Sequence, residues 1–348
     1  MKIREIYNIS KRNGTWDFYG EGIMAPDILD AKNCKEFIEE YIEVSEKSDQ
    51  ELFNNIKELF KNHPNRLSHI VSTFFLGLWL FKHKKSKFLH ESIVNELKDL
   101  KCFSQEDEKV VIEEQFTFVW FMATLFHDLG YPAEENGIEL PKYEIPCKKN
   151  SVPDFYADVY ENYYEYRENK EHGIYAGLTF DRDICIIRKD KSKDPKSKRK
   201  WDKKYEELYH YVAWIILSHN IYVIRDNEER EKLEAYNHNG LNKLIWSSEK
   251  DENGQYKEYK ISFDKFPLFT FFCIIDTIEP LKSTSCLSNV DIQLKGKKII
   301  IKSNDSVYRQ KVLGLKDWLL PVYEESGVVT IYLTPKSNAR TEKIINHK

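Results

Sequence analysis

The strongest constraint on the fold of this chain is an apolar run that ends in a histidine and an aspartate. Residues 113–132 read EEQFTFVWFMATLFHDLGYP, with apolar side chains on nearly every helical face. The pattern predicts a helix buried on all sides, which Gly130 and Pro132 should end. His127 and Asp128 are therefore expected at the inner end of a core helix. A carboxylate buried there costs several kcal/mol unless it is paired or bound to a metal.

Other apolar helical runs also carry a histidine or an aspartate. They are RLSHIVSTFFLGLWLF with His69, YHYVAWIILSHNIYVI with His219, and FPLFTFFCIIDTIEP with Asp276. His172 lies in EHGIYAGL, which we expect near the end of a tyrosine-rich helix over residues 154–178. Imidazole and carboxylate groups together suit a divalent metal that keeps open positions for water and phosphate. Several such groups on separate core helices predict one metal site, assembled by tertiary packing.

The order His, His-Asp, His, His, Asp resembles the HD superfamily of metal-dependent phosphohydrolases. FHDLGYP, EHGIYAG, ILSHN and IIDTIEP carry the resemblance, over roughly residues 64–282. They are similar to the six-ligand, two-metal members, among them enzymes that cleave dinucleoside polyphosphates and cyclic nucleotides. The resemblance implies that Asp128 bridges two metals. It further implies that one metal is held by His69, His127 and Asp276, and the other is completed by His172 and His219.

Two departures leave the substrate open. His219 is followed by Asn220, whereas the branch that cleaves cyclic dinucleotides has an adjacent histidine pair. Tyr131 stands where the dNTP-hydrolysing branch usually has a second histidine. We therefore expect a metal-activated water to cleave a phosphoester or phosphoanhydride bond of a mono-, cyclic or dinucleotide. An HD-type nuclease on single-stranded nucleic acid, or a nucleotide-sensing module without turnover, is the alternative.

Roles can be assigned to individual residues under this hypothesis. The predicted catalytic residues are Asp128, His127 and Arg66, and the predicted substrate-binding residues are Arg66, Tyr131, Asn220 and Lys282. Arg66 lies one turn before His69 on the same helical face, so it can reach a substrate phosphate or form a salt bridge. The alternative to metal binding by Asp276 is an ion pair with Lys282 or Arg66. The alternative for His172 is that EHG forms a polar helix face. His210 is expected to be structural or to support His219.

The expected cofactor is a divalent transition metal, as one or two ions. Six mixed nitrogen and oxygen ligands suit octahedral ions better than a tetrahedral one, which favours Mn or Fe, with Mg, Co or Ni also possible. The expected partner is a nucleotide or another phosphorylated small molecule.

The chain is predicted to be mostly α, as an HD-type helical bundle with a small C-terminal α+β module. We expect an N-terminal helical extension over residues 1–62, the hydrolase core over 63–284 and the module over 285–348. The extension should contain amphipathic helices between residues 33 and 62, and residues 91–100 an exposed helix. In the module, strands at 290–294 and 299–301 flank a turn at Gly296 and Lys297, followed by a helix over 307–320 and a strand over 328–333.

Charge and composition disfavour some classes of protein. The formal charge of −4, from 53 basic and 57 acidic residues, does not favour a protein that binds polyanions over its whole surface. The basic segment 188–204 is expected to be a solvated loop, with phosphate binding as the alternative. The 6 cysteines form no CxxC pair, the N-terminus lacks the apolar stretch of a signal peptide, and no apolar run reaches the ~20 residues of a membrane helix. We expect a cytoplasmic protein with no membrane partner.

Overall fold

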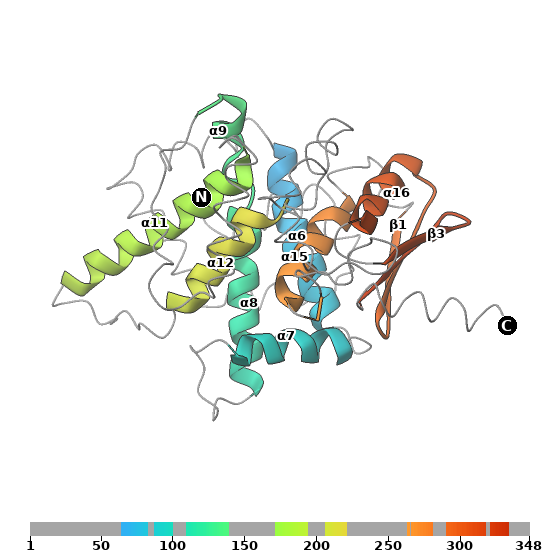
Figure 1. Cartoon of the computed structure of the whole chain (residues 1–348), viewed down its shortest axis with the longest axis horizontal. Coiled ribbons are helices and arrows are strands. Elements are labelled where there is room, and N and C mark those ends of the chain that lie inside the picture. The colour runs from blue at the N-terminus through green and yellow to red at the C-terminus, as the bar shows by residue number, and fades with distance from the viewer. Residues whose placement is uncertain are drawn as a thin grey trace, which may run out of the picture. The chain divides into compact units, whose positions relative to one another are not determined.

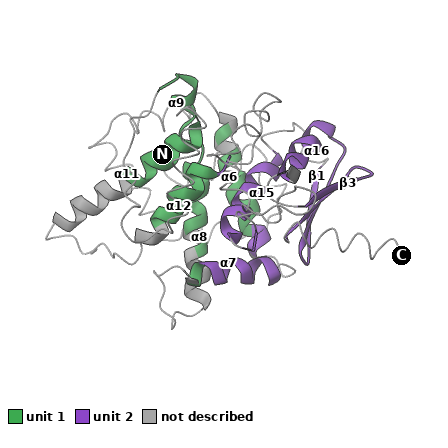
Figure 2. Cartoon of the chain, in the orientation of Figure 1, with its two compact units in different colours: residues 1–78, 97–157, 167–218 green, residues 79–96, 158–166, 219–348 purple. Residues whose placement is uncertain are grey.

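The computed structural model of the chain describes residues 64–82, 87–99, 109–138, 171–193, 206–220, 263–264, 266–280, 290–317 and 321–333. These residues are mostly helical, with a small antiparallel sheet near the C-terminus (Figure 1). The chain divides into two compact units (Figure 2). The first unit comprises residues 1–78, 97–157 and 167–218, and the second comprises 79–96, 158–166 and 219–348. The predicted mostly-α fold is confirmed at this level.

The first unit is built from helices. It contains most of α6 (Pro64–Lys82), the end of α7 (Lys87–Asp99), α8 (Lys109–Phe126), α9 (Tyr131–Glu135), α11 (His172–Lys193) and α12 (Glu206–Ser218). Helix α12 packs against both α11 and α8, and the short α9 packs against α11. Two of the apolar runs predicted as core helices, α8 and α12, thus pack against each other.

Helices α6 and α8 approach closely at a glycine. A Cβ added to Gly77 would lie 2.0 Å from the Trp120 ring, so the indole occupies the space that a side chain would fill. The indole Nε1 donates a hydrogen bond to the Phe74 carbonyl at 2.9 Å. This contact fixes α6, which carries His69, against α8, which leads into His127 and Asp128.

Helices α11 and α12 are held together by a second close approach and by a buried polar pair. A Cβ at Gly177 would lie 2.6 Å from Leu217 Cβ and 2.8 Å from the Ala213 carbonyl. The His210 imidazole Nδ1 lies 2.6 Å from a carboxylate oxygen of Asp181, and both residues are buried. This pairing gives His210 a structural role, one of the two roles predicted for it.

The second unit contains α15 (Pro267–Ile278), in which every residue is buried. Its N-cap residue provides no side-chain cap, but the Leu268 N–H donates to the Glu96 carboxylate of α7 at 2.6 Å. Helix α7 begins at Lys87 and is not the exposed helix predicted over residues 91–100. Its Leu89, Ile93 and Val94 are buried because the helix is amphipathic.

The C-terminal module is a four-stranded antiparallel sheet with one helix, also in the second unit. Its elements are β1 (Val290–Lys295), β2 (Lys298–Ser303), α16 (Ser306–Leu313), the 3₁₀ helix η6 (Gly314–Asp317), β3 (Val322–Glu325) and β4 (Val328–Tyr332), with strand order β1-β2-β4-β3. The predicted β1–β2 hairpin and the last strand are confirmed. Strand β3 was missed, although Ser326 and Gly327, with φ of 50° and 78°, form the tight turn between β3 and β4.

Several predicted boundaries were wrong. His172 begins α11 instead of lying near a helix end, and α11 continues to Lys193, so residues 188–193 of the predicted basic loop are helical. Pro132 does not end a helix, since α9 begins at Tyr131 with this proline in its first turn, where a missing N–H costs nothing. The predicted extension over 1–62 and residues 194–204 lie outside the described residues, and the predicted domain boundaries stay predictions.

Among the described residues, none of the helices is long and apolar enough to cross a membrane.

Candidate metal centre

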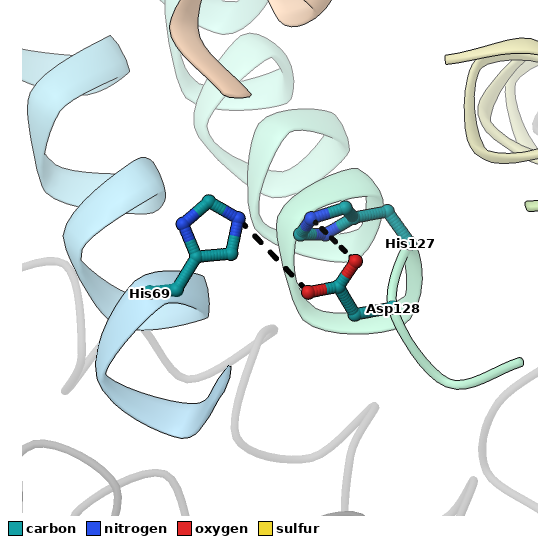
Figure 3. Close-up of side chains that lie close together, drawn as sticks. All are labelled: His69, His127 and Asp128. Atoms are coloured by element: carbon teal, nitrogen blue, oxygen red, sulfur yellow. Dashed lines mark ion pairs between the residues drawn. The ribbon is translucent and has the colours of Figure 1, made fainter. Parts of the chain in front are cut away.

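Side chains from separate helices of the first unit meet around one aspartate. His69 projects from α6, His127 and Asp128 lie in the turn directly after α8, and His172 is the first residue of α11. All are buried, with relative exposures of 1%, 0%, 0% and 4% in that order. Figure 3 shows the His69 and His127 rings next to the Asp128 carboxylate, with a dashed line from each ring to one of its oxygens. Residues separated by up to about a hundred positions in the sequence are thus brought together by the packing of α6, α8 and α11.

The three imidazoles present the same ring nitrogen to this carboxylate. The Nε2 atoms of His127 and His172 lie 3.2 and 3.8 Å from Asp128 Oδ1, and His69 Nε2 lies 4.0 Å from Oδ2. The ligand atoms of His69, His127 and Asp128 all lie within 4.8 Å of one another. One ion can be held by groups at this spacing.

The other ring nitrogens fix the tautomer of two imidazoles. His127 Nδ1 lies 2.8 Å from the Thr124 carbonyl oxygen, and His172 Nδ1 lies 2.6 Å from a Glu134 carboxylate oxygen. A carbonyl or carboxylate only accepts, so both Nδ1 atoms carry a proton, and in this tautomer the ring's lone pair lies on Nε2. A lone pair at 3.2 Å from a carboxylate oxygen is repelled unless a cation lies between them. The donor set therefore fits a metal ion.

Arg66 lies beside the same carboxylate. Its Nη1 donates to Asp128 Oδ2 at 3.4 Å, and its guanidinium carbon lies 3.7 Å above the centre of the Tyr131 ring. The Arg66 side chain is 26% exposed, whereas Asp128 is fully buried. The positive charge thus reaches from the buried carboxylate to the surface of the first unit.

Tyr131 lies between Arg66 and His172. Its ring is stacked on the His172 imidazole, with centroids 3.8 Å apart and planes 16° apart. The guanidinium of Arg66 must lie on the opposite face, because both groups cannot occupy one face at this distance. Both faces of the ring are covered, so Tyr131 has no face left for a nucleobase while Arg66 holds this position.

The remaining predicted ligands belong to the second unit. His219 and Asp276 are buried there, with exposures of 0% and 2%. The Asn220 amide donates to His219 Nε2 at 3.0 Å, and Cys273 Sγ donates to the His219 carbonyl at 3.4 Å. Burial, and then the charge of Asp276, raise the pKa of the Cys273 thiol well above its usual range. Cys273 therefore stays protonated and donates this hydrogen bond at neutral pH.

Part of the predicted ligand set is thus assembled within one unit. The structure brings together His69, His127, Asp128 and His172, along with Arg66 and Tyr131. The predicted participation of His219, Asn220 and Asp276 in the same site stays a prediction, as does the six-ligand set. Lys282 lies outside the described residues.

Glu134 was missed by sequence reasoning. Its contact with His172 joins residues 38 positions apart in the sequence. The sequence shows only an acidic pair, Glu134 and Glu135, after GYP, and such pairs are common on solvated helix faces.

The chain matches no protein-family model, and no curated protein or solved structure is significantly similar to it. The resemblance to HD phosphohydrolases therefore depends on the site residues themselves.

Proposed function

We propose that this chain is a metal-dependent phosphohydrolase with its metal centre at Asp128. The observation that supports this best is the convergence of three imidazole Nε2 atoms, within 3.2 to 4.0 Å, on one buried carboxylate. Histidines with a purely structural role have no need to turn three ring nitrogens toward one carboxylate. His69, His127 and Asp128 would hold a first ion, and His172 would contribute to a second ion bridged by Asp128.

A divalent ion in such a site supplies a water nucleophile at neutral pH and charge for the phosphoryl oxygens. The residues of the chain supply the geometry. The Thr124 carbonyl and the Glu134 carboxylate hold His127 and His172 with their Nε2 lone pairs toward Asp128. Burial of all four side chains removes bulk water, which strengthens the electrostatic interactions at the site.

Arg66 is the proposed phosphate-binding residue. Its guanidinium lies beside Asp128 and is partly exposed, whereas Asp128 is fully buried, so an incoming anion could reach Arg66 before it reaches the carboxylate. Its 3.4 Å contact with Asp128 is long for a charged hydrogen bond, which is usually about 2.7–2.9 Å. A metal ion on Asp128 would weaken this contact further and leave the guanidinium to bind a phosphate. The stack on Tyr131 keeps it oriented.

The proposed substrates are nucleotides, with other phosphorylated small molecules as the broader class. The support is the resemblance of FHDLGYP and EHGIYAG to HD phosphohydrolases, together with Arg66 beside the carboxylate. Since both faces of Tyr131 are covered, base recognition would come from other residues, and we expect tolerance toward the base.

A metal titration followed by a substrate screen tests the proposal. The metal-stripped protein is titrated with Mn²⁺, Fe²⁺ and Zn²⁺ and then assayed on mono-, cyclic and dinucleotides and on single-stranded DNA and RNA. We expect metal uptake and release of a nucleotide product by the wild type and neither by Asp128→Asn. His90, whose ring packs against the Phe81 ring in the second unit, provides the control variant His90→Gln. Cleavage of nucleic acid alone would favour the nuclease, and metal uptake without any turnover would contradict hydrolysis.

A further inference from the structure

The Glu134 carboxylate makes two hydrogen bonds to one residue. Its Oε2 accepts from the His172 backbone N–H at 3.1 Å and from His172 Nδ1 at 2.6 Å. The first bond satisfies an N–H at the start of α11 that has no partner within the helix. The second determines which nitrogen of the imidazole carries the proton. A single oxygen thus fixes both the backbone and the ring of His172.

Two further contacts with the same stretch of chain leave His172 little freedom. The Tyr131 ring is stacked on the imidazole at 3.8 Å. A Cβ added to Gly130 would lie 2.0 Å from the His172 carbonyl oxygen, so the backbones of residues 130 and 172 are in direct contact. The segment from Gly130 to Glu134 therefore contacts the imidazole from its face and from its Nδ1 edge.

We propose that Glu134 is the positioning residue for His172, and that it holds the Nε2 lone pair toward Asp128 for metal binding. This inference rests on the proposed function and adds a residue to that site. Histidine ligands commonly donate their other N–H to a carboxylate, which fixes the tautomer and makes the ring a stronger ligand. Without Glu134, the ring can place its proton on Nε2 and lose the lone pair that faces Asp128.

Glu171 is the other carboxylate near His172 Nδ1, but it lies farther from that nitrogen than Glu134 does. It is buried, and its Oε1 lies 3.8 Å from His172 Nδ1, beyond hydrogen-bonding distance. Glu134 at 2.6 Å is within that distance. Glu171→Gln should therefore leave the tautomer of His172 unchanged.

The decisive variants are Glu134→Ala and Glu134→Gln, with Glu135→Ala on the same short helix as the matched control. Both hydrogen bonds end on one oxygen, so the amide oxygen of glutamine can accept both without the charge. We expect Glu134→Ala to weaken Mn²⁺ binding about 10- to 100-fold and Glu134→Gln to recover most of that loss. Equal losses in the two variants would instead mean a general effect of negative charge, and would overturn the positioning role.

A second readout does not depend on the metal. In the metal-free protein labelled with ¹⁵N-histidine, the His172 signals, assigned with His172→Gln, should show the Nδ1–H tautomer in the wild type, Glu135→Ala and Glu134→Gln. In Glu134→Ala the Nε2–H form should become populated, with the other histidine signals reporting that the fold is kept. An unchanged tautomer in Glu134→Ala would overturn the inference. A wild-type chain that binds no metal would overturn the proposed function, and the tautomer signals would still decide the role of Glu134.

Discussion

His127 and Asp128 are adjacent in sequence, and their side chains face each other across 3.2 Å, from Nε2 to Oδ1. The turn that follows α8 produces this arrangement, because the His127 N–H still bonds to the Ala123 carbonyl while its Nδ1 is bound to the Thr124 carbonyl. Both side chains are buried, and the two facing atoms, a nitrogen lone pair and a carboxylate oxygen, are both electron-rich. A cation bound between these two atoms would stabilise the folded state, so the proposed metal binding can be measured as a gain in stability.

Metal should raise the unfolding free energy of the wild type and not that of Asp128→Asn. A ligand at 100 times its dissociation constant stabilises a protein by about 2.7 kcal/mol if it binds only the folded state. Thermal unfolding with and without Mn²⁺ measures this gain. An equal gain in Asp128→Asn would place the binding site elsewhere.

Arg66→Lys should lower kcat/KM about 10- to 100-fold and change metal affinity little. Hydrogen bonds to charged groups contribute about 1.5–3 kcal/mol, and lysine has neither the planar fork that binds phosphate oxygens nor the flat surface that stacks on Tyr131. Steady-state kinetics and Mn²⁺ titration separate the two effects. If both parameters fall together, Arg66 acts on the metal ligands and not on the substrate.

Gly177→Ala should destabilise the chain by about 1–3 kcal/mol, because the new Cβ would lie within 2.8 Å of backbone and Cβ atoms of α12. Gly314→Ala is the matched control, since nothing lies within 4 Å of its Cβ and its φ of −58° suits alanine. We expect the control to be neutral or slightly stabilising. Urea unfolding of both variants checks the contrast, and similar midpoints would rule out the close α11–α12 approach.

His210→Ala should cost about 3–5 kcal/mol, because it leaves the Asp181 carboxylate buried without its imidazole partner. The double variant Asp181→Ala/His210→Ala should be less destabilised than the sum of the single variants. A double-mutant cycle measures the coupling between the two side chains. Additive effects would mean that the 2.6 Å pair contributes no net stability.

Tyr308→Phe should reduce the rate at which the unfolding free energy falls with pH in the alkaline range. Burial, and then the charge of Glu279, raise the pKa of the Tyr308 hydroxyl well above its usual value near 10. The pKa is higher in the folded than in the unfolded state, so this contribution is complete below about pH 10. It is then lost, as the pH rises toward the folded-state pKa, at up to about 1.4 kcal/mol per pH unit. Urea unfolding at pH 9 to 11 should show a shallower slope for the variant, and parallel slopes would contradict the shift.

Hydrophobic patterning predicted the helices that position the site. The apolar runs of α6, α8 and α15 are long and uninterrupted, so burial decides their structure and their approximate bounds. The clustering of His69, His127, Asp128 and His172 was predicted because buried polar groups on apolar helices need a shared partner. The same reasoning predicted His219 and Asp276, which are buried as expected.

Features that depend on tertiary contacts could not be read from the sequence. His172 begins a helix because Glu134, from another segment, accepts its N–H, and no local signal marks that start. Strand β3 carries Glu324 and Glu325 among only four residues, so its alternating pattern is too short to stand out. Its pairing with β4 comes from the turn at Ser326 and Gly327, which was not recognised as a hairpin signal.

The hydroxyl of Tyr308 donates to the Ile278 carbonyl at 2.5 Å, and this bond joins the C-terminal module to the last turn of α15. The two residues lie on opposite sides of the boundary predicted at 284/285. Gene fusion or truncation there would separate a buried carbonyl from its donor, two residues beyond Asp276. The C-terminal module is thus poorly suited to transfer into another protein as an independent domain. Its sequence should evolve together with that of the helix that carries Asp276.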